Sequence, residues 1–145
     1  MRAGATLFSI LISTSPLTAE AQTLTQQAQC AAQAKANYAE FQAEWKQSPD
    51  MELVMSNYET HYNAKLQKCL MLLSMTTSDK RSHTLGETAL LYDPYERRNY
   101  ASYSWIDRKD APVPIVCMLT PTHTETMYCK TRAEFDSYVA NYMDQ

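Results

Sequence analysis

The chain has 145 residues and a formal net charge of −3, with 13 basic and 16 acidic residues. This length suits one domain with a modest hydrophobic core. A mildly acidic chain with scattered basic residues has no electrostatic reason to bind nucleic acid or anionic lipid. The composition therefore argues against a nucleic-acid partner.

Residues 1–21 have the features of a secretory signal peptide. Arg2 supplies a positive start, residues 7–12 form a short apolar run, and Ala19-Glu20-Ala21 has the small-x-small cleavage pattern. We expect cleavage after Ala21, which leaves a single domain of residues 22–145 in the periplasm or secreted. Because the apolar run is far shorter than the roughly 20 residues of a membrane span, we expect no stable membrane insertion after leader removal. An uncleaved anchor is the alternative.

All four cysteines, Cys30, Cys69, Cys117 and Cys129, lie in the predicted mature domain. An even number behind an export signal favours disulfides over reactive thiols. Three pairings are possible. We favour Cys117 with Cys129, because they bracket a loop between a predicted strand and a predicted helix, and this leaves Cys30 to pair with Cys69.

Residues 22–47 are predicted to form a helix. The segment has no Gly or Pro and is rich in Ala, Gln, Glu and Lys, which favour helices. Its apolar residues recur at steps of three and four and so share one face: Cys30, Ala34, Tyr38, Phe41 and Trp45. Pro49 ends the helix, because proline disfavours helical geometry in the residue before it.

Residues 51–75 fit two structures. Their apolar positions match a helical stripe, but Tyr58, Thr60 and Tyr62 alternate with polar residues, as in a half-buried strand. Residues 70–75 are apolar on both parities, which is typical of a strand covered on both faces. As strands, the two halves would join at Asn63-Ala64-Lys65, with the second strand central. Periodicity alone leaves the choice open.

The remaining chain is predicted to form an antiparallel meander and a final helix. Strands are expected at residues 88–92, 99–106 and 113–119, with loops at 76–86, 107–112 and 120–130. Asp93-Pro94 favours a type I turn. Thr131 and Glu134 form a capping box for the last helix. Its expected buried stripe is Phe135, Tyr138, Val139, Tyr142 and Met143.

These elements predict an α+β fold. An N-terminal helix and a C-terminal helix would pack on an antiparallel sheet of about four to five strands, with two disulfides linking the helices to the sheet.

The motif Tyr58-x-x-His61-Tyr62-Asn63-x-x-Leu66-x-Lys68-Cys69 is followed by Leu91-Tyr92-Asp93 and Tyr100-Ala101-x-Tyr103. The pattern continues with Cys117, Cys129, Glu134-Phe135 and Tyr142-Met143. In these motifs residues 57–143 resemble a group of small exported bacterial proteins of uncharacterised function. The resemblance implies a Gram-negative exported protein with two disulfides, and it favours strands in residues 51–75. It implies no catalytic residue.

The sequence lacks the residues that several common catalytic and ligand-binding sites require. Gly86 is the only glycine of the predicted mature domain, which excludes phosphate-binding loops, dinucleotide fingerprints and the nucleophile elbow. His123 and Glu125 lie two apart, but paired cysteines could not complete a zinc site there. Paired cysteines also provide no thiolate nucleophile. We therefore expect no metal, no cofactor and no catalytic residue.

Two groups of residues are binding candidates. The first, beside the predicted turn, is His61, Tyr62 and Asn63; the second, on the predicted sheet and its turns, is Tyr95, Tyr100, Tyr103 and Trp105. Tyrosine combines a flat apolar ring with a polar tip, which suits protein partners and sugar rings. The alternatives are that the rings fill the core and that Asn63 hydrogen-bonds the turn backbone.

The sequence thus predicts a non-enzymatic binding or inhibitor-like module for an unknown protein or glycan of the cell envelope. One alternative is a small hydrolase with a site near His61, which would use Tyr62 and a carboxylate such as Glu59. The other is a purely structural envelope protein.

Overall fold

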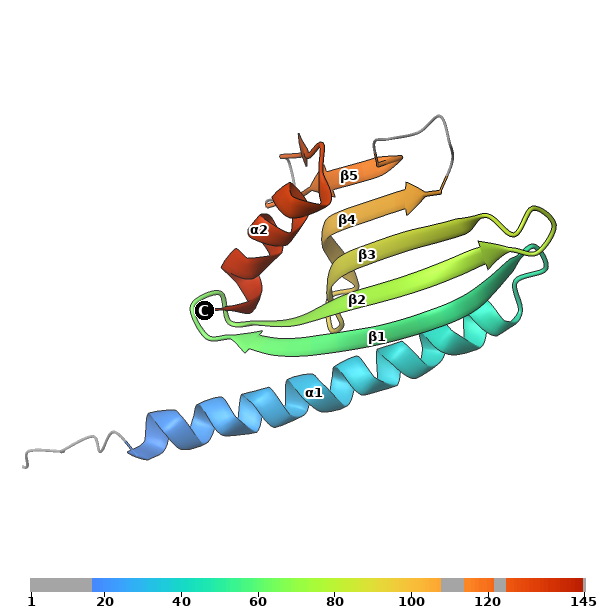
Figure 1. The fold of residues 1–145 in the computed structure, drawn as a ribbon. Coiled ribbons are helices and arrows are strands. Elements are labelled where there is room, and N and C mark those ends of the chain that lie inside the picture. Colours follow the sequence, from blue (N-terminus) through green and yellow to red (C-terminus); the bar gives the residue numbers. More distant parts are fainter. Residues whose placement is uncertain (1–16, 108–113, 122–124, 145) are drawn as a thin grey trace, which may run out of the picture.

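The computed structural model describes residues 17–107, 114–121 and 125–144. Two helices flank six strands in chain order: α1 (Leu17–Lys46), β1 (Met51–Asn63), β2 (Lys68–Asp79), β3 (Leu85–Asp93), β4 (Arg98–Ile106), β5 (Val116–Leu119), β6 (Met127–Tyr128) and α2 (Arg132–Met143). The strands form one antiparallel sheet in the order β1-β2-β3-β4-β5-β6 (Figure 1). The predicted α+β fold is confirmed, with six strands in place of four to five.

Residues 51–75 form strands. Tyr58 pairs with Leu73 and Tyr62 with Cys69, so the apolar stripe that also fitted a helix is divided between two antiparallel strands. Strand β2 is covered on both faces, as expected. Its successive side chains point to opposite faces of the sheet, and Leu70 lies in the core under α2 while Met71 lies in the core under α1. It lies next to the edge strand β1 and is not central.

The predicted loop at residues 76–86 is wrong over much of its length. Strand β2 continues to Asp79 and β3 begins at Leu85, so only residues 80–84 connect them. The polar residues of this stretch suggested a loop, but threonine is favoured in strands. Thr77 is buried and pairs with Leu53 of β1 on one side and with Gly86 of β3 on the other, so this polar residue lies within the sheet.

The two helices cover opposite faces of the sheet (Figure 1). On one face Ala34 of α1 packs with Met71, Leu73 and Met75, joined by the aromatic residues Tyr38, Phe41 and Trp45. On the other face Phe135 and Val139 of α2 pack against Leu70, Leu91 and Ala101. Both predicted helix stripes are therefore confirmed as the faces that meet the sheet.

The three hairpins that connect β1 to β4 turn in the same way. Each starts with an Asn or Asp whose Oδ1 accepts a hydrogen bond from the backbone N–H three residues on: Asn63 from Leu66, Asp79 from Ser82, and Asp93 from Glu96. The residue four positions after each of them has a positive backbone φ: Gln67 at 53°, His83 at 56° and Arg97 at 53°. Glycine usually takes this left-handed conformation, and these turns do without it.

The end of the chain differs from the prediction in three respects. Strand β5 begins at Val116, and the short strand β6 lies within the predicted loop at residues 120–130. One of the two hydrogen bonds of the predicted capping box is present, since Thr131 Oγ1 accepts a hydrogen bond from the Glu134 N–H. The Glu134 carboxylate, however, accepts from the Lys130 N–H at 2.7 Å, one residue before the N-cap.

Both predicted disulfides are present. Cys30–Cys69 joins α1 to β2, and Cys117–Cys129 joins β5 to the segment that enters α2. Within the described ranges no helix combines the length and apolarity that crossing a bilayer requires.

The two disulfides should contribute unequally to stability, because they close loops of 39 and 12 residues. On the chain-entropy model, replacing Cys30 and Cys69 together by Ala should lower the free energy of unfolding by about 4 kcal/mol, and replacing Cys117 and Cys129 by about 3 kcal/mol. Urea denaturation of the two double variants measures both losses. An unchanged stability for the Cys30/Cys69 double variant would contradict the role given to this link.

Alkaline pH should destabilise the fold through its buried and half-buried tyrosines. Burial, with a hydrogen bond between the Tyr138 and Tyr142 hydroxyls, raises the pKa of Tyr138 well above its usual range, and burial also raises the pKa of Tyr100 and Tyr103. In the unfolded chain these phenols ionise near pH ~10, so the unfolded state loses protons first as the pH rises. The free energy of unfolding should therefore be fully retained below about pH 10 and decrease above it.

Urea denaturation across this range, followed by tyrosinate absorbance, measures the effect. The variant Tyr138→Phe should show a shallower decrease with pH than the wild type. Identical slopes in the two proteins would mean that Tyr138 has no part in it.

Candidate functional site

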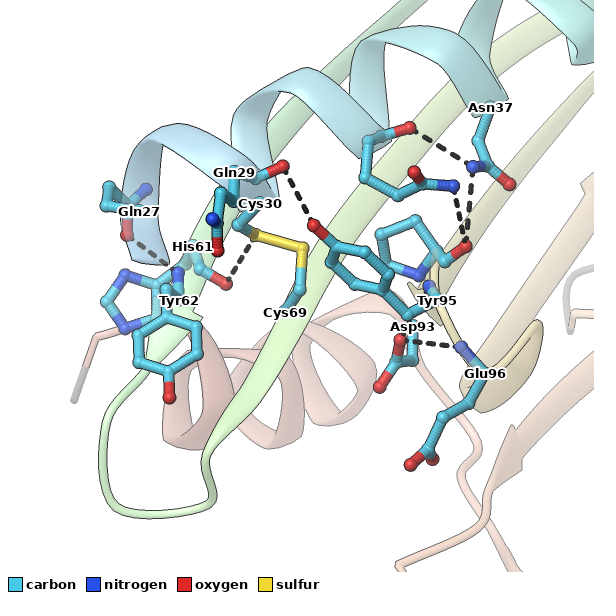
Figure 2. Close-up of a disulfide and its surroundings, with 12 residues drawn as sticks. Gln27, Gln29, Cys30, Asn37, His61, Tyr62, Cys69, Asp93, Tyr95 and Glu96 are labelled. Carbon is cyan, nitrogen blue, oxygen red and sulfur yellow. Dashed lines mark hydrogen bonds between the residues drawn. A yellow bond between two sulfur atoms is a disulfide. The ribbon is translucent and has the colours of Figure 1, made fainter. Parts of the chain in front are cut away.

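A hollow of about 280 Å³ opens beside the Cys30–Cys69 disulfide, and we call it the disulfide hollow. Three segments far apart in the sequence meet there: α1, the β1–β2 hairpin and the β3–β4 turn (Figure 2). Besides the disulfide, its lining consists of two tyrosines, three glutamines and three charged residues: Tyr62, Tyr95, Gln26, Gln29, Gln67, Lys68, Asp93 and Glu96.

The disulfide and a neighbouring hydrogen bond hold α1 against the hairpin. Cys30 and Cys69 are both buried. The backbone N–H of Tyr62 donates to Oε1 of Gln27 at 2.8 Å, and Cys30 Sγ lies 3.6 Å from the His61 carbonyl oxygen (Figure 2). The α1 wall of the hollow is thus fixed covalently and by a hydrogen bond to the outer edge of β1.

The β3–β4 turn forms the opposite wall. Asp93 is buried, and its Oδ1 accepts hydrogen bonds from the N–H groups of Tyr95 and Glu96 at 2.8 and 3.0 Å. Because of this turn the Tyr95 side chain projects toward α1, where its hydroxyl donates to the Gln29 carbonyl at 3.1 Å (Figure 2). The Asn37 side chain donates to the Pro94 carbonyl at 3.3 Å and so also holds the turn on the helix.

The charges around the hollow are paired with one another. Lys68 and Glu96 form an ion pair, and the hydrogen bond to Glu96 raises the pKa of Lys68. Asp93 is engaged by its own turn. An incoming ligand therefore finds no unpaired charge among these three residues.

The side-chain amides of the three glutamines remain available to a ligand. Within the described part of the chain the side chains of Gln26, Gln29 and Gln67 make no hydrogen bond, ion pair or ring contact. Each primary amide offers two donors and an acceptor. Three such groups around one hollow, between two phenol rings, can hydrogen-bond a polar ligand without breaking any internal bond.

The predicted binding residues do not form one site. Tyr62 and Tyr95 both line the disulfide hollow. His61 points to the other face of the sheet, since it pairs with Leu70 of the α2-side core while Tyr62 pairs with Cys69. The two residues therefore cannot act on one substrate from the same side of β1.

Asn63 has a structural role. Its side chain is fully buried, accepts from the Leu66 N–H at 3.0 Å and donates to the Tyr142 carbonyl at 2.9 Å. It links the β1–β2 turn to the end of α2, which agrees with the alternative that it hydrogen-bonds the turn.

The other predicted aromatic residues lie away from the hollow. Tyr100 and Tyr103 are only 4% and 6% exposed and pack under α2, where Tyr103 contacts the ring of Phe135. Trp105 borders a separate hollow near the start of α2, beside Glu87. Glu87 and Arg132 are joined there by an ion pair. For Tyr100 and Tyr103 the core-packing alternative is the one the structure bears out.

Sequence reasoning missed the three glutamines and Lys68. A usable signal was present, because Gln26 and Gln29 precede Cys30 while Gln67 and Lys68 precede Cys69. Once Cys30 is paired with Cys69, the residues next to both cysteines must lie together. No group of three metal-ligating side chains comes together among the residues that the structure describes. His123 and residues 108–112 of the predicted loop at 107–112 lie outside those residues.

A second hollow, of about 250 Å³, lies between α1 and the middle of the sheet. Its floor is formed by core residues such as Met71 and Leu73, and the exposed ion pair of Glu40 and Arg97 lies at its rim. Since its apolar floor belongs to the core under α1, the disulfide hollow is the better candidate for a polar ligand.

Comparisons with protein-family models, with curated proteins and with solved structures each found no match. The resemblance to small exported bacterial proteins therefore stays a prediction.

Replacement of Asn63 by Ala should lower the free energy of unfolding by about 2–3 kcal/mol, because it removes two hydrogen bonds and leaves the Tyr142 carbonyl without its partner. Asn57→Ala is the matched control, as Asn57 is exposed on the same strand and should change stability by less than about 0.5 kcal/mol. Urea denaturation compares the two. Equal values would show that Asn63 is not a structural link.

Proposed function

We propose that this protein is an exported, non-enzymatic binding module that takes its ligand in the disulfide hollow. The observation that carries the proposal is the set of unengaged amides and tyrosine rings around a hollow whose walls are fixed by a disulfide. A rigid frame lowers the entropy lost on binding, and so favours recognition of a ligand over packing alone.

Two features support export. Disulfides form and persist in oxidising compartments, and all four cysteines are paired. The first turns of α1 extend beyond the sheet (Figure 1), so cleavage after Ala21 would leave the contacts of Gln27 and Cys30 intact. The periplasm or the outside of the cell is therefore the proposed location.

The groups in the hollow support binding over catalysis. A general base needs a pKa near the working pH, whereas glutamine does not titrate and the pKa of Lys68 moves away from neutrality. The hydrolase alternative needs His61 and Tyr62 on one side, but they point to opposite faces of the sheet.

The proposal is tested by the melting temperature of the mature protein in the presence of envelope fractions, one of soluble glycans and one of polypeptides. A ligand at about 100 times its Kd stabilises the fold by about 2.7 kcal/mol, which raises the melting temperature measurably. At least one fraction should do so for the wild type but not for Gln29→Ala, a change that keeps the backbone carbonyl bonded by Tyr95.

Asn57→Ala is again the control and should respond as the wild type does. A fraction that stabilises all three proteins equally would place the ligand elsewhere. If neither fraction raises the melting temperature of the wild type, the binding proposal fails.

A further inference from the structure

We infer that the ligand of the disulfide hollow is a neutral saccharide, bound through one or two of its rings. The inference rests on the proposed function, since it names the ligand class of the same hollow.

Charge is the first argument. Lys68 is paired with Glu96, and the buried Asp93 carboxylate is held by the backbone of its turn. An anionic or a cationic ligand would have to compete with these internal bonds. A neutral ligand leaves all of them in place.

Hydrogen bonding is the second argument for a neutral saccharide. The side-chain amides of Gln26, Gln29 and Gln67 can each donate and accept. A sugar hydroxyl also donates and accepts, so every hydroxyl that enters can be matched in either sense. An apolar ligand would instead remove water from these amides without replacing its hydrogen bonds, which costs free energy.

The aromatic rings are the third. Tyr62 and Tyr95 lie on either side of the disulfide (Figure 2). The bond from the Tyr95 hydroxyl to the Gln29 carbonyl holds that ring in place although the side chain is 56% exposed. The face of a tyrosine ring is apolar and weakly negative, and it suits the C–H face of a pyranose ring.

The backbone of Gln67 is the fourth. With φ at 53° this residue holds the left-handed conformation that glycine takes at least cost. A glutamine at a position where the turn itself favours glycine retains a side chain that borders the hollow. His83 and Arg97 take the same conformation in the equivalent turns, so the conformation belongs to the turn, and what counts for the hollow is that the Gln67 side chain borders it.

The size of the hollow limits the ligand. Its volume of about 280 Å³ is just below the roughly 300–1,000 Å³ of pockets for drug-sized molecules. It therefore takes one end of an oligosaccharide, with the remaining rings in solvent.

The test uses the purified mature protein and four probes: a trimer of N-acetylglucosamine, maltotriose, an anionic trigalacturonate and a neutral tetrapeptide of Ala and Ser. Binding is measured by calorimetry at low and high salt. A neutral trisaccharide should bind, and its affinity should be unaffected by salt because no charge is recognised.

The chain provides a matched pair of variants. His83 has φ at 56° in the β2–β3 turn, at the opposite end of the sheet from the hollow (Figure 1). Gln67→Gly and His83→Gly both relieve a left-handed residue, so both should raise the melting temperature. Gln67→Gly should weaken saccharide binding about tenfold or more, the loss expected for one direct hydrogen bond, while His83→Gly leaves it unchanged.

Three outcomes overturn the inference: binding of trigalacturonate or the peptide alone, saccharide binding that Gln67→Gly leaves intact, or no binding of any neutral saccharide. The envelope fractions distinguish this failure from that of the proposed function. If the polypeptide fraction still stabilises the wild type and not Gln29→Ala, the hollow binds a different ligand and only the saccharide inference is wrong.

Discussion

The Cys30–Cys69 link determines how α1 lies on the sheet. The helix α1 meets the sheet along a single stripe, and Cys30 and Ala34 are its fully buried members. The bond to β2 places this stripe over Met71 and Leu73, so β2 is covered on one side by α1 and on the other by α2. A small domain with two thin layers of core gains stability from such a bond, because it limits the freedom of the unfolded chain.

The same link positions the walls of the disulfide hollow. Gln26 and Gln29 lie on the turn of α1 next to Cys30, and Gln67 and Lys68 precede Cys69. The β3–β4 turn reaches the same place because Asp93 directs Tyr95 toward α1. A structural bond and a candidate binding site thus share their residues.

Turn chemistry replaces glycine in this protein. Asn63, Asp79 and Asp93 each begin a hairpin with the same side-chain-to-backbone hydrogen bond, and each hairpin ends with a non-glycine residue at positive φ. Two of these three turn residues were recognised in the sequence. Asp79 was missed, because the polar residues before it suggested a loop, although they belong to β2 and are paired on both sides.

By itself the sequence determined what depends on local chemistry and spacing. The stripe of α1, the cap at Thr131 and the turn at Asp93 all follow from residues close to one another. The even count of cysteines favoured two disulfides but allowed three pairings, of which the structure has the favoured one. Tertiary structure alone decided which tyrosines face solvent: Tyr62 and Tyr95 line a hollow, whereas Tyr100 and Tyr103 lie under α2. The physical reason is that alternation along a strand assigns two faces but does not say which helix covers which face, or how far that helix extends.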